Sequence, residues 1–368
     1  DRILKNGAVV FGEEIEQVFK VKTPRVEKFD IIDGKNGYLT PGLIDVHIHG
    51  AGGRDTMDAD FDALDAISGS IIRGGVTSFL PTTMTMPMKS IRRALENIAD
   101  CRRQQLTGAQ ILGANIEGPF LSQEKKGAQS PEHMLPPDSR YFHGFEDIIK
   151  LVTVAPEQPG AEKFIREMSS LGIVTAVGHS AATYEQVNQA RSWGLSHATH
   201  LFNGMTGIHH RRPGVAGAVL NSNMTCELIA DFIHLSPVVL ELVMKIKDSD
   251  EIILITDSIR AAGLPDGEYG LGGKTVVVRG KEARLKSGSL AGSVLTLDRA
   301  VKNMYNTGEL PLQEVVKMAT INPARLLKVD HKLGRIDPGY RADLTLFDRD
   351  LNVKKVFVGG KEKYSSGK

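Results

Sequence analysis

The sequence predicts an α/β protein: a (β/α)8 TIM-like barrel with a small β-sandwich domain formed by the N- and C-terminal segments. From residue 43, eight short apolar runs alternate with longer amphipathic segments, over roughly 250 residues, the usual size of this barrel. No glycine-rich dinucleotide fingerprint follows any run, which argues against the competing open, doubly wound sheet. Near both chain ends the strands are instead short and alternating, with glycine turns between them.

The eight runs are predicted as barrel strands because they are rich in β-branched and apolar residues, as strands buried on both faces are. In order they are LIDVH (43–47), VTSFLPT (76–82), QILGANIEG (110–118), IKLVTVAPE (149–157), IVTAVGHS (173–180), SHATHLFN (196–203), TCELIADFIH (225–234) and EIILITDS (251–258). Between them, residues 60–74 and 160–172 place apolar side chains at helical spacing and end at glycines. Ser236-Pro237 predicts the N-cap and first residue of another helix.

The remaining segments predict additions to the barrel. Residues 1–42 together with 335–368 are expected to pair into the small β domain, which leaves 43–334 for the barrel. Residues 274–286 (KTVVVRGKEARLK) predict a hairpin inserted after the eighth strand. The loop 118–148 is long and shows little periodicity, and a connection of that length in a compact fold is usually functional or disordered.

Composition narrows the partners and the location. The formal net charge is +1, so no global field attracts nucleic acid or a membrane surface, and an anionic partner must be bound by a local patch. There is no apolar run of about 18 residues, so no membrane span is predicted. Two cysteines are too few for a disulfide framework, and nothing at the start resembles a signal peptide, so we expect a cytoplasmic protein.

Side chains that bind metals follow the ends of successive predicted strands. They are His47, His49, Glu117, His179, His200, Asp231, His234 and Asp257. The carboxyl ends of the strands carry the functional groups in a barrel of this type. Positions i and i+2 on a strand share a face, so His47 and His49 can bind one ion side by side, and Asp45 on the same face is a candidate to orient an imidazole. Imidazole and carboxylate together predict a divalent ion such as zinc, iron, cobalt or manganese.

Several motifs occur in a fixed order between about residue 38 and residue 348. They are PGLIDVHIHG, IEGPF, VGHS, HLFNGM, HHRRPG, ADFIH, TDS and LAGS. Together they resemble the amidohydrolase superfamily and, within it, the N-acetylglucosamine-6-phosphate deacetylase family. The first motif marks the superfamily, whereas IEGPF, HLFNGM with HHRRPG, and ADFIH are more specific to the deacetylases. The resemblance implies hydrolysis of N-acetyl-D-glucosamine 6-phosphate to D-glucosamine 6-phosphate and acetate by metal-activated hydroxide, in amino-sugar catabolism or recycling.

The resemblance also implies roles for individual residues. The family's metal ligands match Glu117, His179, His200, His47 and His49. The last two match a pair that holds a second ion in some members, so one or two divalent ions per subunit are expected, zinc before iron, cobalt or manganese. Asp257 matches the catalytic aspartate. A carboxylate beside an activated water can take its proton and pass it to the leaving amine.

The same resemblance implies a binding site for a phosphorylated N-acetyl amino sugar. Its residues match Ala128, Gln129, Asn203, Gly204, Arg211, Asp231, His234, Leu290, Ala291 and Gly292. Arg211 matches the phosphate-binding arginine, whose forked donors suit phosphate oxygens, and Asn203 and Gly204 are expected to supply backbone donors. Within the family this arginine can reach in from a neighbouring subunit, so a homodimer is expected.

The long loop departs from the family pattern, and Arg212 stands where glutamate commonly precedes the proline. KKGAQSP (125–131) places Gln129 where many members have a substrate-contacting histidine, and glutamine cannot carry positive charge. A second ion at His47 and His49 is our hypothesis for what polarises the substrate instead. Three alternatives stay open: the galactosamine epimer of the substrate, a cyclic amide hydrolase, and a non-catalytic assembly protein. The basic HHRR segment argues against the second, and the complete ligand set argues against the third.

Overall fold

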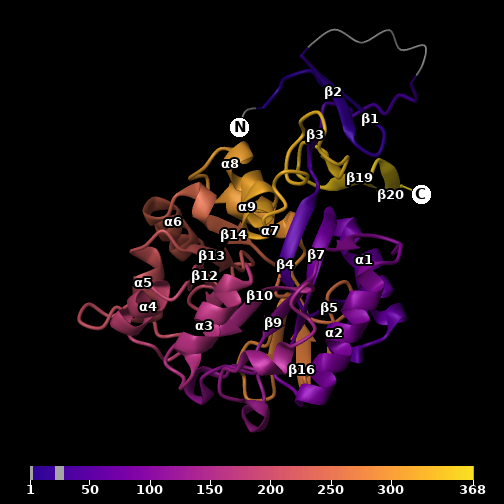
Figure 1. The fold of residues 1–368 in the computed structure, drawn as a ribbon. Helices are drawn as coiled ribbons and strands as arrows, with labels where there is room; N and C mark the ends of the chain where they lie inside the picture. The colour runs from indigo at the N-terminus through magenta and orange to yellow at the C-terminus, as the bar shows by residue number, and fades with distance from the viewer. Residues whose placement is uncertain (1–2, 21–28, 368) are drawn as a thin grey trace.

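The computed structural model describes residues 3–20 and 29–367, and its centre is a barrel of parallel strands surrounded by helices (Figure 1). In spatial order the barrel strands are β14 (Ile252–Leu254), β13 (Thr225–Leu228), β12 (His197–Ala198), β11 (Val174–Val177), β10 (Ile149–Val154), β9 (Ala114–Glu117), β7 (Val76–Thr83) and β4 (Leu43–Ile48). All residues of β4 and β7 are buried, as predicted for strands that are covered on both faces. The predicted (β/α)8 barrel is confirmed.

The barrel closes between its first and last strands. Just beyond β14, the backbone N–H of Asp257 donates to the carbonyl of His47 (2.9 Å), and the N–H of His49 donates to the carbonyl of Ser258 (2.9 Å). Ile48 and Ser258 form a parallel bridge. The ends of the first and eighth strands therefore lie side by side, which places Asp257 against the two histidines that follow the first strand.

Helices cover the outside of the barrel (Figure 1). They are α1 (Phe61–Ile71), α2 (Met88–Arg102), α3 (Ala161–Ser170), α4 (Tyr184–Arg191), α5 (Gly214–Leu220), α6 (Pro237–Ile246), α7 (Leu297–Asn306), α8 (Leu312–Lys317) and α9 (Ile321–Leu326). The helices predicted within 60–74 and 160–172 are α1 and α3, and α6 begins at Pro237 with Ser236 as its N-cap. None of the helices in the described part of the chain has the length and apolarity that a membrane span requires.

Strands from both chain ends pack beyond the amino ends of the barrel strands (Figure 1). They are β1 (Gly7–Phe11), β2 (Ile15–Lys20), β3 (Tyr38–Pro41), β18 (Leu344–Phe347), β19 (Val353–Val358) and β20 (Lys361–Ser365). β1 pairs with β2, and β3 pairs antiparallel with β18 in a four-stranded sheet, so the two chain ends do form a small β unit. The boundaries at residues 42 and 335 stay a prediction, and residues 1–2, 21–28 and 368 lie outside the described residues.

The segment after β14 forms a three-stranded antiparallel sheet, one strand more than the predicted hairpin. Its strands are β15 (Gly267–Leu271), β16 (Lys274–Arg279) and β17 (Glu282–Leu285). The prediction missed β15 because GEYGL contains two glycines and little apolar surface. Lys274 Nζ donates to the carbonyls of Ala128 (2.8 Å) and Gln129 (3.0 Å), so this sheet anchors the long loop that follows β9. Short strands β5 (Gly50–Ala51), β6 (Arg54–Asp55) and β8 (Gln110–Ile111) complete the fold.

Candidate metal centre and active site

Six side chains meet in two adjoining groups at the carboxyl ends of the barrel strands. One group is Glu117, His179 and His200, and the other is His47, His49 and Asp257; the ligand atoms of each group lie within 4.8 Å of one another. All six residues are buried. His47 and Glu117 lie at the ends of β4 and β9, and the other four residues lie just after β4, β11, β12 and β14. Strand ends that are far apart in the sequence therefore bring these six side chains into one cluster.

The Glu117 carboxylate lies between the two groups. Its Oε1 is 3.1 Å from His179 Nε2 and 2.9 Å from His200 Nε2. Its Oε2 is 3.2 Å from His49 Nε2. On the far side, Asp257 Oδ1 lies 3.3 Å from the same His49 nitrogen and 3.5 Å from His47 Nε2. His47 Nε2 lies 3.7 Å from Glu117 Oε1, so the Glu117 carboxylate borders imidazoles of both groups and is placed to be shared by two ion positions.

In three of the imidazoles an oxygen acceptor holds the outer nitrogen. The pairs are His179 Nδ1 with the Lys125 carbonyl (2.8 Å), His49 Nδ1 with the Thr82 carbonyl (3.3 Å) and His47 Nδ1 with Glu227 Oε2 (2.9 Å). Carbonyls and ionised carboxylates only accept hydrogen bonds, so in the neutral rings the proton is on Nδ1 and the Nε2 lone pair faces the centre. His47 Nε2 is buried without a hydrogen-bond partner. Lone pairs directed at carboxylate oxygens repel them unless a cation lies between, so these residues fit a divalent metal ion.

The charges of the centre also suit a cation. Burial disfavours a charge on His47, yet the surrounding carboxylates, Glu227 first and Asp257 next, raise its pKa to about 9. Burial likewise opposes the charge on Glu117, but the neighbouring imidazoles, His179 foremost, hold the pKa of that carboxyl well below its usual range. Protons on imidazoles thus compensate the buried carboxylates. A divalent ion would take their place, and its binding would release protons.

Three of the six residues adopt a left-handed backbone conformation that side chains other than glycine rarely adopt. The φ angles are +46° for His179, +28° for His200 and +48° for Asp257. Such strain concentrates at functional sites, where the surrounding structure has to hold it. Each residue lies just after a strand, where the turn of the backbone directs the side chain to the shared centre.

Two of the predicted substrate-binding residues, Gln129 and Ala128, belong to the long loop that follows β9. Gln129 is buried: its Oε1 accepts from the Thr85 N–H (2.8 Å), and its Nε2 donates to Glu117 Oε2 (2.5 Å). Thr85 thereby fixes the amide with its donor end toward the cluster. The Ala128 carbonyl accepts from Lys274 Nζ (2.8 Å).

The segment after β12 holds predicted phosphate-binding residues. The backbone N–H of Asn203 donates to the His200 carbonyl (2.9 Å), and its role toward phosphate stays a prediction. The turn that it closes holds Gly204 against His179: a Cβ on that glycine would lie 2.8 Å from His179 Nδ1. Arg211 is exposed and donates to His210 Nε2 (2.6 Å), and it makes no hydrogen bond or ion pair with the six described cluster residues.

Two further predicted segments lie at strand ends. After β13, His234 Nδ1 and Asp231 Oδ2 are 2.7 Å apart, and the carboxylate also accepts the backbone N–H of His234. The segment Leu290–Gly292 packs beside Asp257, because a Cβ on Gly292 would lie 2.9 Å from the Asp257 carbonyl oxygen. The Ala291 N–H donates to the Ala283 carbonyl (3.0 Å), which ties this segment to β17.

Sequence reasoning missed one buried acid and misassigned another. The Asp45 carboxylate accepts from Thr256 Oγ1 (2.6 Å) and from the backbone N–H of His47 (3.3 Å), and it is not bonded to an imidazole of the described residues. The carboxylate that does orient the His47 ring belongs to Glu227 on β13. An acidic residue in the middle of the apolar run TCELIA was the signal that would have found it.

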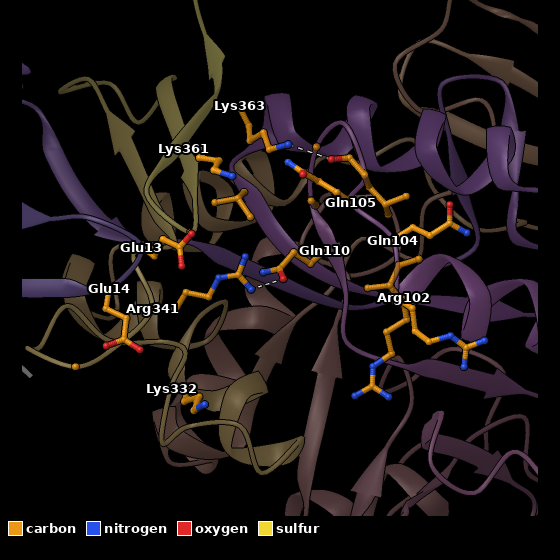
Figure 2. Close-up of a pocket in the computed structure, with 18 residues that line it drawn as sticks. Glu13, Glu14, Arg102, Gln104, Gln105, Gln110, Lys332, Arg341, Lys361 and Lys363 are labelled. Atoms are coloured by element: carbon orange, nitrogen blue, oxygen red, sulfur yellow. Dashed lines mark hydrogen bonds between the residues drawn. The ribbon is translucent and has the colours of Figure 1, made fainter.

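A separate cleft of about 500 Å³ lies at the other end of the barrel, beside the small β unit (Figure 2). Its charged lining includes Glu13, Glu14, Arg102, Arg341, Lys361 and Lys363. Arg341 donates to Gln110 and pairs with Asp343 (3.3 Å), which holds β18 against the start of the barrel. Histidine and cysteine are absent from the lining of this cleft, so the metal chemistry belongs to the other end.

A closed parallel barrel with buried imidazoles and carboxylates at its carboxyl end defines a class, the TIM-barrel metal-dependent hydrolases. Residues 38–363 match the Amidohydrolase family, and the chain belongs to that family. Within it, the chain is 41% identical over 337 residues to the N-acetylglucosamine-6-phosphate deacetylase of Lysinibacillus sphaericus, covering 90% of this chain and 87% of the relative.

Two more deacetylases are similar to this chain. The chain is 39% identical over 327 residues to the N-acetylgalactosamine-6-phosphate deacetylase of Escherichia coli O157:H7, covering 88% of this chain and 86% of the relative. A solved structure of a mutant N-acetyl-D-glucosamine-6-phosphate deacetylase from Mycobacterium smegmatis, in complex with N-acetyl-D-glucosamine-6-phosphate, superposes with a TM-score of 0.91. That match is 30% identical and covers 98% of this chain and 95% of the other.

Proposed function

We propose that this enzyme is an N-acetylglucosamine-6-phosphate deacetylase, which hydrolyses N-acetyl-D-glucosamine 6-phosphate to D-glucosamine 6-phosphate and acetate in amino-sugar catabolism or recycling. One observation carries the proposal: Glu117 lies between two histidine groups at the barrel end, in a chain 41% identical to such a deacetylase. A cyclic amide hydrolase or a non-catalytic assembly protein would not account for both the complete cluster and this identity.

The metal cofactor is proposed as one or two divalent ions per chain, with zinc first and iron, cobalt or manganese as alternatives. Glu117, His179 and His200 would hold one ion, and His47 and His49 would hold the second with Glu117 shared. A bound divalent ion lowers the pKa of water to roughly 7 and polarises an amide carbonyl. Nitrogen and oxygen donors of this kind suit zinc, but they also suit the other three metals.

Asp257 is proposed as the acid–base residue. Its Oδ1 borders both His47 and His49, and the residue is 8% exposed, so the carboxylate can meet a substrate that enters from the barrel end. Its backbone is fixed on both sides, by the bond to His47 and by the Ser293 N–H, which donates to the Asp257 carbonyl (2.8 Å). A carboxylate in this place can take the proton of the attacking water and deliver it to the leaving amine nitrogen, which is a poor leaving group until it is protonated.

The neutral amide of Gln129 is proposed to donate to the acetamide carbonyl of the substrate. Thr85 holds its donor end toward the cluster, so only a small movement away from Glu117 is needed. The sugar would pack against Ala128, the Asp231–His234 pair and the Leu290–Gly292 segment. Gly204, whose backbone reaches His179, is proposed to line the same pocket.

Arg211 is proposed as the phosphate-binding residue, supplied to the site of a second chain in a homodimer. Its exposed position supports this, because its side chain makes no hydrogen bond or ion pair with the six described cluster residues of its own chain. The cytoplasm is proposed as the location, since both cysteines, Cys101 and Cys226, are free and buried, as suits a reducing compartment.

The test is acetate release from three substrates after metals have been counted in the purified protein. N-acetylglucosamine 6-phosphate should react fastest, and treatment with a chelator should abolish the reaction until a divalent ion is restored. A higher rate on N-acetylgalactosamine 6-phosphate would instead assign the epimer named for the Escherichia coli relative. Equal rates on unphosphorylated N-acetylglucosamine would contradict the phosphate-binding role of Arg211.

A further inference from the structure

Glu227 is a carboxylate that is completely buried on β13 and lies outside both metal-ligand groups. Its Oε2 accepts from His47 Nδ1 (2.9 Å) and from the backbone N–H of His200 (3.0 Å). Its Oε1 lies 3.3 Å from His197 Nε2. Among the described residues, its ion-pair partners are the imidazoles of His47 and His197, with no lysine or arginine. One buried acid is therefore bonded to both ligand groups at once.

The two bonds act on the groups differently. His47 is held through its ring, so Glu227 fixes the tautomer and the direction of the nitrogen that faces the centre. His200 is held through its backbone, at the strained turn with φ of +28°, while its own ring nitrogens are not bonded to Glu227. The electrostatic effect of the carboxylate on a ligand atom is thus direct for His47 and indirect for His200.

His197 holds Glu227 in place from the other side. This imidazole is buried, and its Nδ1 lies 2.7 Å from Thr225 Oγ1. If the Thr225 hydroxyl donates to Nδ1, the neutral ring carries its proton on Nε2 and donates it to Glu227. One chain of hydrogen bonds then runs from the amino end of β13 to the metal centre. Its members, in order, are Thr225, His197, Glu227 and His47.

We infer that Glu227 is the positioning residue for the His47–His49 ion position, and that it decides whether this position is occupied beside the one at Glu117, His179 and His200. The inference rests on the proposed metal centre. It assigns to Glu227 no contact with substrate or with the reacting atoms.

The experiment titrates Zn²⁺ into the metal-free full-length protein by calorimetry and counts bound zinc by elemental analysis. Wild type should bind two ions. Glu227→Gln should still bind the first ion, while the second binds about 10- to 100-fold more weakly, the usual effect of losing an outer partner of a metal-bound imidazole. Glu227→Asp keeps the charge but is one methylene shorter, so its affinity for the second ion should lie between those of wild type and Glu227→Gln. It serves as the test if the glutamine variant does not fold.

The matched control is Asp45→Asn. Asp45 is equally buried, and its partners are a hydroxyl and a backbone N–H, from which an amide oxygen can also accept. Its carboxylate is not bonded to an imidazole of the described residues, and zinc binding should equal wild type. If Glu227→Gln binds both ions as wild type does, or if Asp45→Asn loses the second ion equally, the inference is overturned while the proposed function stands. A wild-type protein that binds no ion overturns the proposed function as well.

Discussion

Substituting Gly204 by alanine tests how closely the chain after β12 supports the metal centre. The backbone of Gly204 has φ of +59°, where an alanine costs about 1–2 kcal/mol. The added Cβ would lie 2.8 Å from His179 Nδ1 and 3.0 Å from Cε1. Ordinary contact begins at 3.4 Å, so the imidazole ring has to move by about 0.6 Å, the difference between 3.4 and 2.8.

That movement acts on a ligand. His179 Nδ1 is bonded to the Lys125 carbonyl at 2.8 Å, and its Nε2 faces Glu117. Displacing the ring strains both contacts, and disturbing such an outer bond typically costs 10- to 100-fold in metal affinity, or about 1.4–2.8 kcal/mol. We therefore expect Gly204→Ala to weaken the ion held by Glu117, His179 and His200 by this factor.

The assay is calorimetric titration of Zn²⁺ into metal-free protein, with thermal unfolding of the same metal-free samples. Gly207→Ala is the control, because it lies three residues later, has no positive φ, and its added Cβ would meet no atom within 4 Å. The control should bind zinc as wild type does. Equal zinc affinity in Gly204→Ala and Gly207→Ala would refute the reasoning, since the predicted contact with His179 would then have no consequence.

Three other outcomes are expected. Asp257→Asn should lower kcat for acetate release by roughly 10²- to 10⁴-fold, because proton transfer to the amine is lost; a KM change with unaltered kcat would argue against this role. Arg211→Ala should raise KM for the phosphorylated sugar by roughly 10- to 100-fold, because a charged hydrogen bond is lost. The KM for the unphosphorylated sugar should not change, and Arg212→Ala is the neighbouring control. Burial raises the pKa of Asp343 from 3.8 to about 6, so its contribution to stability is full below pH 3.8 and is lost as the pH rises through 6. Relative to Asp343→Asn, wild type should therefore lose up to about 3 kcal/mol of unfolding free energy between pH 4 and 8 in urea titrations; a constant difference would contradict the shift.

The sequence predicted the parts of the protein that follow local rules. Eight apolar runs between amphipathic segments identify a barrel because each strand is buried on both faces. His47 and His49 could be placed together because side chains alternate along a strand, and strand ends share one rim. The resemblance of the motifs to a known family then added Glu117, His179 and His200 to the predicted metal ligands. No local sequence pattern connects these three residues.

What the sequence could not predict depends on register across the barrel. Glu227 meets His47 although 180 residues separate them in the chain. Asp45 is nearer in sequence and shares the strand face of His47, yet its carboxylate turns to Thr256. Which of two buried acids reaches an imidazole is decided by the stagger of the strands.

The number of ions can also be argued from charge. With the imidazoles neutral, the centre has three buried carboxylates, Glu117, Asp257 and Glu227. A buried centre is stable only near electrical neutrality, because uncompensated charge in a low-dielectric interior is costly. One divalent ion leaves one negative charge in this set, whereas two leave one positive charge, which a hydroxide formed from the activated water would neutralise. Replacing Glu227 by glutamine leaves two carboxylates, which a single divalent ion neutralises. Charge and hydrogen-bond geometry are independent arguments, and both predict that this substitution leaves the protein with one tightly bound ion.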